Sequence, residues 1–227
     1  MRNEDLEIIA KTVLFSGLAE KELERVGQVA LEKHFSKGQS VFMEGEEGAG
    51  FYIVSKGLVK IYKISMDGKE QILHIMGPGE PFGEVPVFSG QRFPANAETL
   101  TESELLFFPR QDFVDLIAHY PSLAMNMLAV LSGRLRQFTI QIENLTLREV
   151  PARLAAYLIY LADREKQDKA VTLDISKGQL ASLLGTVPET LSRALTNMKN
   201  NGLIQTDGNV IILLKRRELE ELAERGR

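Results

Sequence analysis

The stretch PSLAMNMLAVLSGRLRQFTIQIENL (residues 121–145) carries apolar or small side chains at intervals that alternate between four and three residues. This spacing is typical of the apolar seam of a coiled coil, and a helix of this length spans roughly 30 Å. So narrow a seam needs a partner, and the simplest partner is the same helix in a second copy of the chain. The sequence therefore predicts a parallel homodimer, with packing of the stripe on the chain's own core as the alternative. The stripe consists of Ala124, Leu128, Leu131, Leu135, Phe138, Ile142 and Leu145.

The chain before this helix has the texture of a β domain. Two amphipathic helices are expected first, over residues 4–13 and 20–31. Between residues 34 and 109, short apolar or β-branched runs are separated by glycine-containing turns, and Asp67-Gly68 is the strongest hairpin signal among them. Many short strands joined by tight turns predict a jelly roll or sandwich of about eight strands.

The chain after residue 147 is predicted to form a second, mainly helical domain. Pro151 is tolerated only in the first turn of a helix, so a break must precede it, and a helix is expected over residues 153–164. Near the end of the chain, Asp207-Gly208 separates two apolar runs and predicts a β-hairpin.

Between these elements, the motif SKGQLASLLGTVPETLSRALTNMKNNGLI (residues 176–204) predicts a helix-turn-helix. Ser176 can cap a first helix that runs to Leu184, and Gly185 permits a tight turn. Pro188 can then open a second helix that reaches about residue 200. Two antiparallel helices that do not bind DNA are the alternative. Because a β-hairpin is predicted directly after the second helix, a winged helix-turn-helix is the better interpretation. The shared core of the two helices is expected to contain Leu180, Ala181, Leu184, Leu191 and Ala194.

Composition limits the class of protein. A chain of 227 residues with 44% hydrophobic and 26% charged side chains suits two small globular domains. The absence of cysteine excludes thiolate zinc sites and cysteine-ligated iron–sulfur clusters. No apolar run approaches the length of a membrane span and no signal peptide is present, so the sequence predicts a cytoplasmic protein that makes no contact with a membrane.

Charge is distributed unevenly between the two halves. Residues 1–147 hold 14 basic and 20 acidic side chains, whereas residues 148–227 hold 13 and 11. The second half could therefore approach a polyanion, although a surplus of two cations is weak evidence for nucleic-acid binding. An enzyme is the rival class, but the sequence contains no phosphate loop, HExxH motif or nucleophile elbow. A cupin-type small-molecule binding protein would explain the β domain and leave the helix-turn-helix without a role.

Three motifs resemble those of the Crp/Fnr family of bacterial transcription regulators, and the resemblance covers nearly the whole chain. They are LFSGLAEKEL (residues 14–23), PGEPFGEVPVF followed by QRFPANAETL (78–88 and 91–100), and GTVPETLSRALTNMKNNGLI (185–204).

The resemblance implies an α+β fold with three parts. These are an N-terminal β jelly-roll sensor domain of the cyclic-nucleotide-binding type over residues 1–120, a long dimerisation helix over 121–147, and a C-terminal winged helix-turn-helix DNA-binding domain over 148–227. It also implies a homodimer that binds an inverted-repeat operator in double-stranded DNA and works with RNA polymerase.

The base-reading residues follow from the Fnr branch, whose pattern Glu-x-x-Ser-Arg matches Glu189, Ser192 and Arg193. A Glu can accept from the amino group of cytosine, and an Arg can donate twice to guanine. Thr190, between them, and Lys199, placed for a phosphate, complete the predicted DNA-contacting set. Because the Crp branch carries an Arg and a Gly at the positions of residues 188 and 192, half-sites like TTGAT are favoured over TGTGA.

The expected effector pocket departs from the cyclic-nucleotide pattern. Gly83 and Glu84 match the segment whose Glu holds a ribose hydroxyl, but the Arg-Ser pair that binds the cyclic phosphate aligns with Phe93 and Pro94. An anionic nucleotide buried without a cation is strongly disfavoured, so the sequence predicts an effector other than cAMP. A cAMP-responsive regulator remains the alternative if Arg92 shifts by one position. On the dimer helix, Phe138 replaces a Thr of the Crp-like proteins and Thr139 matches the neighbouring Ser.

The segment RFPANAETL is similar to that of the Dnr and HcpR-like branches, whose members are associated with nitric oxide or nitrosative stress and with haem. A haem would need an axial ligand, and the candidates are His34, His74 and His119, of which His74 is the first choice. None of them is spaced with another as in a metal site. An apolar small molecule packed against Phe93 and Phe138 is an equal alternative.

Overall fold

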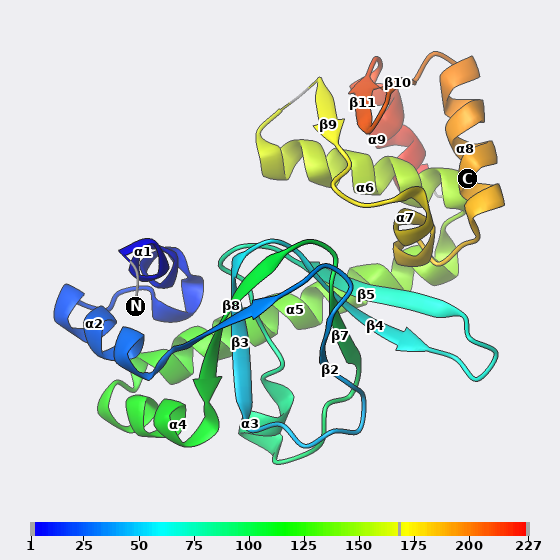
Figure 1. Cartoon of the computed structure of the whole chain (residues 1–227). Coiled ribbons are helices and arrows are strands. Elements are labelled where there is room, and N and C mark those ends of the chain that lie inside the picture. The colour runs from blue at the N-terminus through cyan, green and yellow to red at the C-terminus, as the bar shows by residue number, and fades with distance from the viewer. Residues whose placement is uncertain (1–2, 168, 226–227) are drawn as a thin grey trace. The chain divides into compact units, whose positions relative to one another are not determined.

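The computed structural model describes residues 3–167 and 169–225 (Figure 1). The chain divides into two compact units, Met1–Leu135 and Arg136–Arg227. Both units contribute to one continuous helix, α5 (Ser122–Leu147), which occupies the range expected for the dimer helix.

The first unit contains two four-stranded antiparallel sheets within the described part of the chain. The predicted jelly roll is therefore confirmed, because the strands pair across the chain rather than in simple sequence order. One sheet has the order β1 (Leu31–Phe35), β8 (Ser103–Pro109), β3 (Gly50–Lys56) and β6 (Pro81–Phe82), and the other has the order β2 (Ser40–Phe42), β7 (Asn96–Thr99), β4 (Val59–Ile64) and β5 (Glu70–Met76).

Strand β3 explains why the run FYIV is apolar without alternation. Its residues from Gly50 to Ser55 are all buried, since one face of the strand meets the interior of the jelly roll and the other meets the helices. Tyr52 and Val54 lie in the interior with Phe42 and Phe82. On the other face, Phe51 packs against helix α4 (Arg110–His119) through an edge-to-face contact with Phe113. A strand covered on both faces needs apolar side chains at every position.

The N-terminal helices differ at their ends from the expected ranges. Helix α1 spans Asn3–Lys11 and is followed by a 3-10 turn, Val13–Phe15. Helix α2 spans Glu20–Val29 rather than reaching residue 31, because Ala30 is already extended and Leu31 begins strand β1, where it pairs with Phe107 of β8. A short helix, α3 (Val85–Ser89), was not expected; its second position is Pro86, which fits a first helical turn.

Among the described residues, no single helix is long and apolar enough to cross a membrane. Helices α4 and α5 reach that length and composition only when taken together, and they are bent by 116° relative to each other.

The second unit is a winged helix-turn-helix. Helix α6 spans Val150–Glu165, so it starts earlier than expected, with Pro151 in its first turn. Helices α7 (Lys177–Leu183) and α8 (Pro188–Asn200) follow, and the predicted hairpin is formed by β10 (Ile204–Asp207) and β11 (Val210–Leu213). Strand β9 (Ala170–Thr172) adds a third strand to the wing, and helix α9 (Arg216–Arg225) packs against α6; neither was expected.

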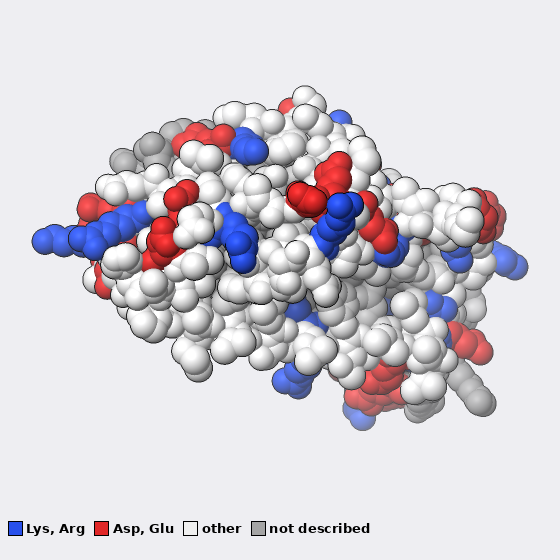
Figure 2. Space-filling view, turned by 90° about the horizontal axis from the view of Figure 1, so that it is seen from below, with Lys and Arg blue, Asp and Glu red and all other residues white. Residues whose placement is uncertain are grey.

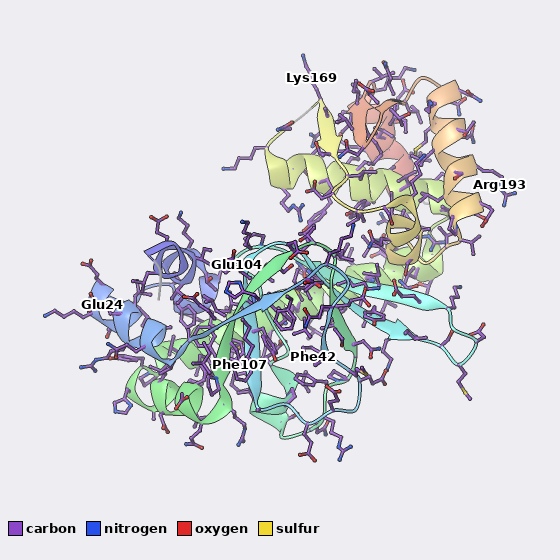
Figure 3. The ribbon with its side chains drawn as sticks, viewed as in Figure 1. Glu24, Phe42, Glu104, Phe107, Lys169 and Arg193 are labelled. Atoms are coloured by element: carbon purple, nitrogen blue, oxygen red, sulfur yellow. The ribbon has the colours of Figure 1, made fainter. Side chains whose placement is uncertain are left out.

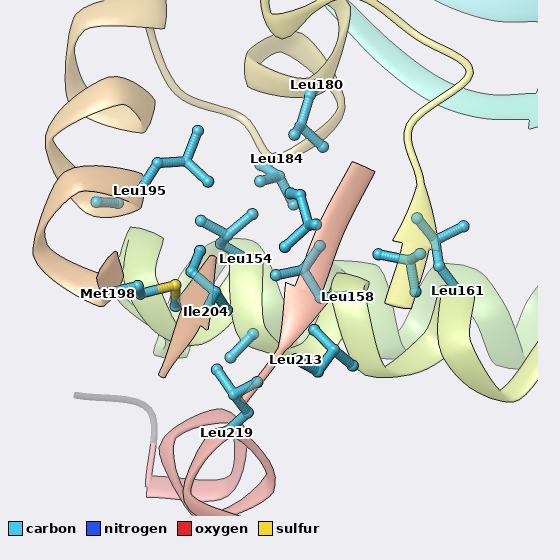
Figure 4. Packing of buried hydrophobic residues seen from close by; sticks show 14 of the residues in the cluster. Leu154, Leu158, Leu161, Leu180, Leu184, Leu195, Met198, Ile204, Leu213 and Leu219 are labelled. Atoms are coloured by element: carbon cyan, nitrogen blue, oxygen red, sulfur yellow. The ribbon is translucent and has the colours of Figure 1, made fainter. Parts of the chain in front are cut away.

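Side chains from helices α6, α7, α8 and α9 meet in one apolar core of the second unit (Figure 4). Helix α6 contributes Leu154, Leu158 and Leu161 from one face. Helix α9 closes the core with Leu219, which is fully buried. Burial of a whole Leu side chain contributes about 1.5–3 kcal/mol, which is why a short terminal helix can dock stably here.

Candidate DNA-reading site and effector pocket

The helix-turn-helix is built by local interactions at its start and in its turn. Ser176 caps α7: its Oγ accepts from the Gln179 N–H at 3.2 Å, and the Gln179 side chain accepts from the Ser176 N–H at 2.8 Å. Helix α7 ends at Leu183, one residue before the predicted end. Gly185 then has a φ of +64°, a left-handed conformation that glycine adopts without strain. The turn therefore needs glycine at this position.

The packing between α7 and α8 agrees with the predicted shared core. Leu180, Ala181, Leu184, Leu191 and Ala194 are all buried. Ala181 is small enough for the helices to approach closely, and the Thr186 N–H donates to its carbonyl at 2.9 Å. The turn and the core together hold α8 in a defined position on its domain.

The outer face of α8 carries the predicted base-reading side chains near its N-terminus. Glu189, Ser192 and Arg193 are exposed, and Thr190 is half-buried between them. Nη2 of Arg193 donates to Oγ1 of Thr190 at 3.1 Å, so Thr190 orients the guanidinium. Figure 3 shows Arg193 projecting outward from α8, away from α6 and α7. Side chains one turn apart on a helix that can enter a major groove are able to reach neighbouring base edges.

The cations around the wing have different surroundings. Lys199, in the last turn of α8, is exposed. Arg216 is bound within the domain, at 2.5 Å from Asp163 and 2.9 Å from Glu220, and these carboxylates raise its pKa. Lys215 contacts Glu218 at 3.0 Å. Of these three cations, Lys199 is therefore the one best placed for a phosphate.

The face of the molecule seen in Figure 2 is of mixed charge. On the face seen in Figure 2, the described Lys and Arg side chains are interspersed with Asp and Glu, and neither sign forms an extended field. Evidence for nucleic-acid binding therefore rests on the helix-turn-helix and not on a general basic surface.

In the first unit, three of the expected pocket residues lie together. Gly83, with a φ of +76°, follows strand β6, and Glu84 begins the turn into α3. The ring of Phe93 packs over Gly83, since a Cβ on that glycine would lie 3.3 Å from it. Phe93 is itself buried and stacks on Phe42 with ring centroids 3.7 Å apart and an angle of 7° between the planes. The position that aligns with the phosphate-binding arginine is therefore occupied by a packed aromatic ring.

Pro94 and Arg92 flank this ring on the surface. Pro94 is exposed, and its carbonyl accepts from Nζ of Lys63. Arg92 is also exposed and contacts Glu47 at 3.3 Å and the Gly45 carbonyl at 3.1 Å. In this arrangement Arg92 does not replace the missing cation of the pocket.

Glu84 has a partner that the sequence did not reveal. Its Oε1 accepts from Nη1 of Arg134 at 2.5 Å, and Nη2 of Arg134 donates to the Pro81 carbonyl. Both side chains are largely buried. The carboxylate expected to hold a ribose hydroxyl is thus bound by the chain's own guanidinium, which comes from helix α5.

Near this ion pair lies a second carboxylate, Glu80. Its Oε1 is 3.8 Å from Nε2 of His74, and its Oε2 accepts from the Gly77 N–H at 2.6 Å. Burial on its own raises the pKa of Glu80, but the contact with His74, the hydrogen bond from the Gly77 N–H and the charge of Arg134 bring the pKa below its usual value. His74, the favoured haem-ligand candidate, therefore already contacts a carboxylate.

The other two histidines differ in setting. His34 is exposed on the edge strand β1, and Nδ1 of His119 lies 2.7 Å from the Asp115 carbonyl. Among the described residues, no group of three or more His, Asp or Glu side chains is arranged to hold a metal ion.

The apolar stripe of α5 is mostly exposed in the single chain. Leu131 is half-buried against the core of the first unit, whereas the exposed fractions of Leu128, Leu135, Phe138, Ile142 and Leu145 range from 37% to 69%. Thr139, next to Phe138, is exposed as well. Phe138 and Thr139 belong to the second unit, unlike the other expected pocket residues.

Comparison with known proteins follows the same division of the chain. Residues 32–120 match the cyclic nucleotide-binding domain, and residues 152–222 match the Crp-like helix-turn-helix domain. A CRP-like cAMP-activated global transcriptional regulator of Mycobacterium tuberculosis is 32% identical over 225 residues, which make up 97% of this chain and 99% of that protein. The chain belongs to the Crp/Fnr family of transcription regulators.

Other similar proteins come from several branches of the Crp/Fnr family. The fumarate and nitrate reduction regulatory protein of Escherichia coli is 28% identical, over 91% of this chain and 84% of that protein. Among solved structures, FixK2 from Bradyrhizobium japonicum superposes with a TM-score of 0.78 at 27% identity and covers 86% of this chain and 97% of that chain. The predicted fold class is confirmed, and this Crp/Fnr regulator carries the DNA-binding helix-turn-helix of its family.

Arg134 is the pocket residue of this Crp/Fnr regulator that sequence reasoning missed. It lies one helical turn before Phe138, next to the seam, and is a cation within a mainly apolar helix. That position was the available signal, because a charged residue beside a coiled-coil seam often reaches across to a partner of opposite sign.

Proposed function

We propose that the protein is a homodimeric, sequence-specific transcription regulator that reads an inverted-repeat operator with helix α8 and responds to an effector other than cAMP. The observation that carries the DNA-reading part is the exposed trio of Glu189, Ser192 and Arg193 at the start of α8. These side chains suit cytosine, a thymine or polar base edge, and guanine. The resemblance to the Fnr branch favours half-sites like TTGAT, and Thr190 and Lys199 support the contact.

The homodimer is supported by the exposed stripe on α5. An isolated chain would leave the side chains from Leu128 to Leu145 in water, and burying them against a second copy is favourable by about 25 cal/mol for each Å² of apolar surface. The inverted repeat follows from this assembly, because a two-fold symmetric dimer presents two α8 helices to half-sites about one helical turn apart. A regulator that acts on a promoter is expected to have RNA polymerase as a partner and to work in the cytoplasm. We propose no catalytic activity.

The proposal of a non-cAMP effector is supported by Phe93 and Glu84. A cyclic phosphate needs a cation, and the aligned position holds an aromatic ring that is stacked on Phe42. The ribose-binding carboxylate is already paired with Arg134. The relative from Mycobacterium tuberculosis is described as cAMP-activated, so cAMP is the alternative that the experiment must address directly.

An apolar small molecule is the effector class that the pocket favours. Phe42, Tyr52, Phe82 and Phe93 form a buried aromatic cluster inside the jelly roll, and a ligand that packs against this cluster would have to be mainly apolar. A haem that senses nitric oxide is the second candidate, with His74 as its ligand, and it would require the contact between His74 and Glu80 to open.

Selection of bound duplexes from a random DNA pool tests the DNA-reading part. The purified protein should enrich an inverted repeat whose half-sites lie about 34 Å apart, and a gel shift should give one dimer per repeat. Enrichment of single, unpaired sites, or of no sequence, would contradict the proposal. Calorimetry with cAMP and an absorption spectrum of protein purified after haem feeding then separate the effector classes.

A further inference from the structure

Arg153 of helix α6 contacts the turn of the helix-turn-helix. Its Nη1 donates to the Leu184 carbonyl at 2.5 Å and approaches the Gly185 carbonyl at 3.4 Å. Both residues directly follow Leu183, the last residue of α7. At the C-terminus of a helix the carbonyls have no N–H partner within the helix, and the helix dipole gives this end a partial negative charge. A guanidinium from a neighbouring helix therefore satisfies the end of α7.

This contact is costly for the domain. Arg153 reaches the turn from a helix whose neighbouring side chains, such as Leu154, lie in the apolar core. Burial lowers the pKa of Arg153, and its Nε–H is buried without an acceptor among the residues that the structure describes. Arg153 is half-buried, and a charge that is partly removed from water while one of its donors stays unsatisfied adds little stability, so an apolar side chain of similar volume is often neutral or better. The benefit of Arg153 therefore has to be sought in geometry.

The geometry in question is that of the recognition helix. The turn from Leu184 to Val187 sets the direction in which α8 leaves α7, and Glu189 follows only two residues later. Arg153 itself lies in the first turn of α6, shortly after the break between α5 and α6. Its backbone N–H donates to the Glu149 carbonyl. One side chain thus ties the start of the domain to the turn that aims the base-reading residues.

Base reading and phosphate contact differ in how much misplacement they tolerate. A bidentate Arg–guanine contact requires a planar fork in register with two acceptors, whereas Lys makes a flexible point contact with phosphate. Groups that must act together need to be held to about 0.5 Å. A loosened turn would therefore impair discrimination between sequences before it impairs attachment to DNA.

We propose that Arg153 is a positioning residue for base reading: it fixes the turn between α7 and α8, and thereby supports preference for the operator over other sequences. The inference rests on the proposed function, since it concerns the same DNA-reading site. Arg153 does not contact DNA in this role, and its effect is transmitted through the carbonyls of Leu184 and Gly185.

The test compares Arg153→Met and Arg153→Lys with the wild type. Met fills the volume without a donor, and Lys keeps the charge but has no planar fork for the two carbonyls. Arg148→Met is the matched control, because Arg148 lies beside the same break but contacts Glu143, at 3.0 Å. Each protein is titrated by fluorescence anisotropy against the selected operator and against a scrambled duplex at several salt concentrations, and its melting temperature is measured.

We expect Arg153→Met to lower the ratio of operator affinity to scrambled affinity by about 10-fold or more, the scale of one lost bidentate base contact. Affinity for the scrambled duplex, its salt dependence and the melting temperature should change little. Arg153→Lys should lie between Arg153→Met and the wild type, and Arg148→Met should match the wild type.

Three outcomes would overturn the inference. The first is an unchanged affinity ratio in both Arg153 variants. The second is an equal loss of affinity for operator and scrambled DNA together with a lower melting temperature, because this result would give Arg153 a purely structural role. The third is an equal loss of the ratio in Arg148→Met. A wild type that shows no preference for any duplex would instead contradict the proposed function, so the two failures are distinguishable.

Discussion

Replacing Leu135 by Glu should separate the proposed dimer into monomers. Leu135 occupies the middle of the apolar stripe on α5, and 69% of it is exposed in the single chain. In a dimer this exposed part would be buried, and the symmetry of the assembly would place two copies of the residue close together. The substitution would therefore remove two apolar contacts and bring two carboxylates into one apolar seam.

The size of the effect follows from the exposed fraction. Complete burial of a Leu contributes about 1.5–3 kcal/mol, so the exposed part of Leu135 accounts for about 1–2 kcal/mol in each copy. Two copies contribute about 2–4 kcal/mol, which corresponds to a rise of roughly 30- to 1000-fold in the dimer dissociation constant. Repulsion and desolvation of the carboxylates add to this figure.

Sedimentation over a dilution series measures the constant directly, and circular dichroism shows whether the helices are retained. Leu147→Glu is the matched control: Leu147 is 75% exposed on the same helix but lies outside the stripe. The control should remain dimeric. A Leu135→Glu protein that stays dimeric at low micromolar concentration, or a Leu147→Glu protein that dissociates to the same extent, would refute the seam.

Four further predictions concern the two sites. Arg193→Ala should cost about 1–3 kcal/mol of binding free energy at the operator and relax the preference at one base pair. Lys199→Ala should instead weaken binding to all duplexes alike and make the salt dependence of binding shallower. An equal loss of specificity in both variants would mean that Arg193 is only a phosphate contact. Calorimetry with cAMP should show no heat, because an aromatic ring occupies the position of the phosphate-binding arginine, and micromolar binding that promotes operator binding would reverse this conclusion. Arg134→Met should lower the free energy of unfolding by about 3 kcal/mol by leaving the carboxylate of Glu84 buried without a partner, and adding Glu84→Gln should recover much of the loss in chemical denaturation. Because the pKa of Glu80 is lowered in the folded state, its carboxylate stabilises the fold above pH 4.5 and loses this effect as the pH falls through the folded-state pKa. Glu80→Gln should therefore flatten the dependence of the free energy of unfolding on pH in acid. An unchanged curve would contradict the assignment.

Local patterns in the sequence were sufficient for most of the elements, although α3, β9 and α9 were not predicted. The stripe on α5, the turn signals of the β domain and the helix-turn-helix motif each depend on residues within a few positions of one another. Backbone periodicity, capping and glycine conformation act over the same range. For this reason the roles of Ser176, Gly185 and Pro188 in the turn could be predicted from the sequence. The exposed trio on α8, in contrast, was predicted from the resemblance to the Fnr branch.

Errors in these expectations occurred where a distant partner decides the outcome. Leu31 fits the end of an amphipathic helix, but pairing with Phe107 makes it the first residue of a strand. No element was predicted for RRELEELAER (residues 216–225), yet this segment forms α9 and Leu219 docks it on the core. At Leu31 tertiary pairing outweighs local propensity, because a ladder of hydrogen bonds exceeds the few tenths of a kcal/mol that separate local conformations. In α9 local propensity already favours a helix, and the burial of Leu219 decides where this helix docks.

The expected effector pocket shows most clearly which features follow from the sequence and which are decided only by the tertiary structure. The resemblance of the sequence to the Crp/Fnr family predicted that Phe93 stands where a phosphate-binding cation is expected, and the proposal of an effector other than cAMP starts from that prediction. Only the tertiary structure decided that this ring stacks on Phe42, that Glu84 is held by Arg134, and that Arg153 reaches the Leu184 carbonyl. These partners lie between 31 and 51 residues apart in the chain, and no local rule relates them. A side chain's partner at that separation is set by how the whole chain folds, since each contact depends on the simultaneous position of two independent elements.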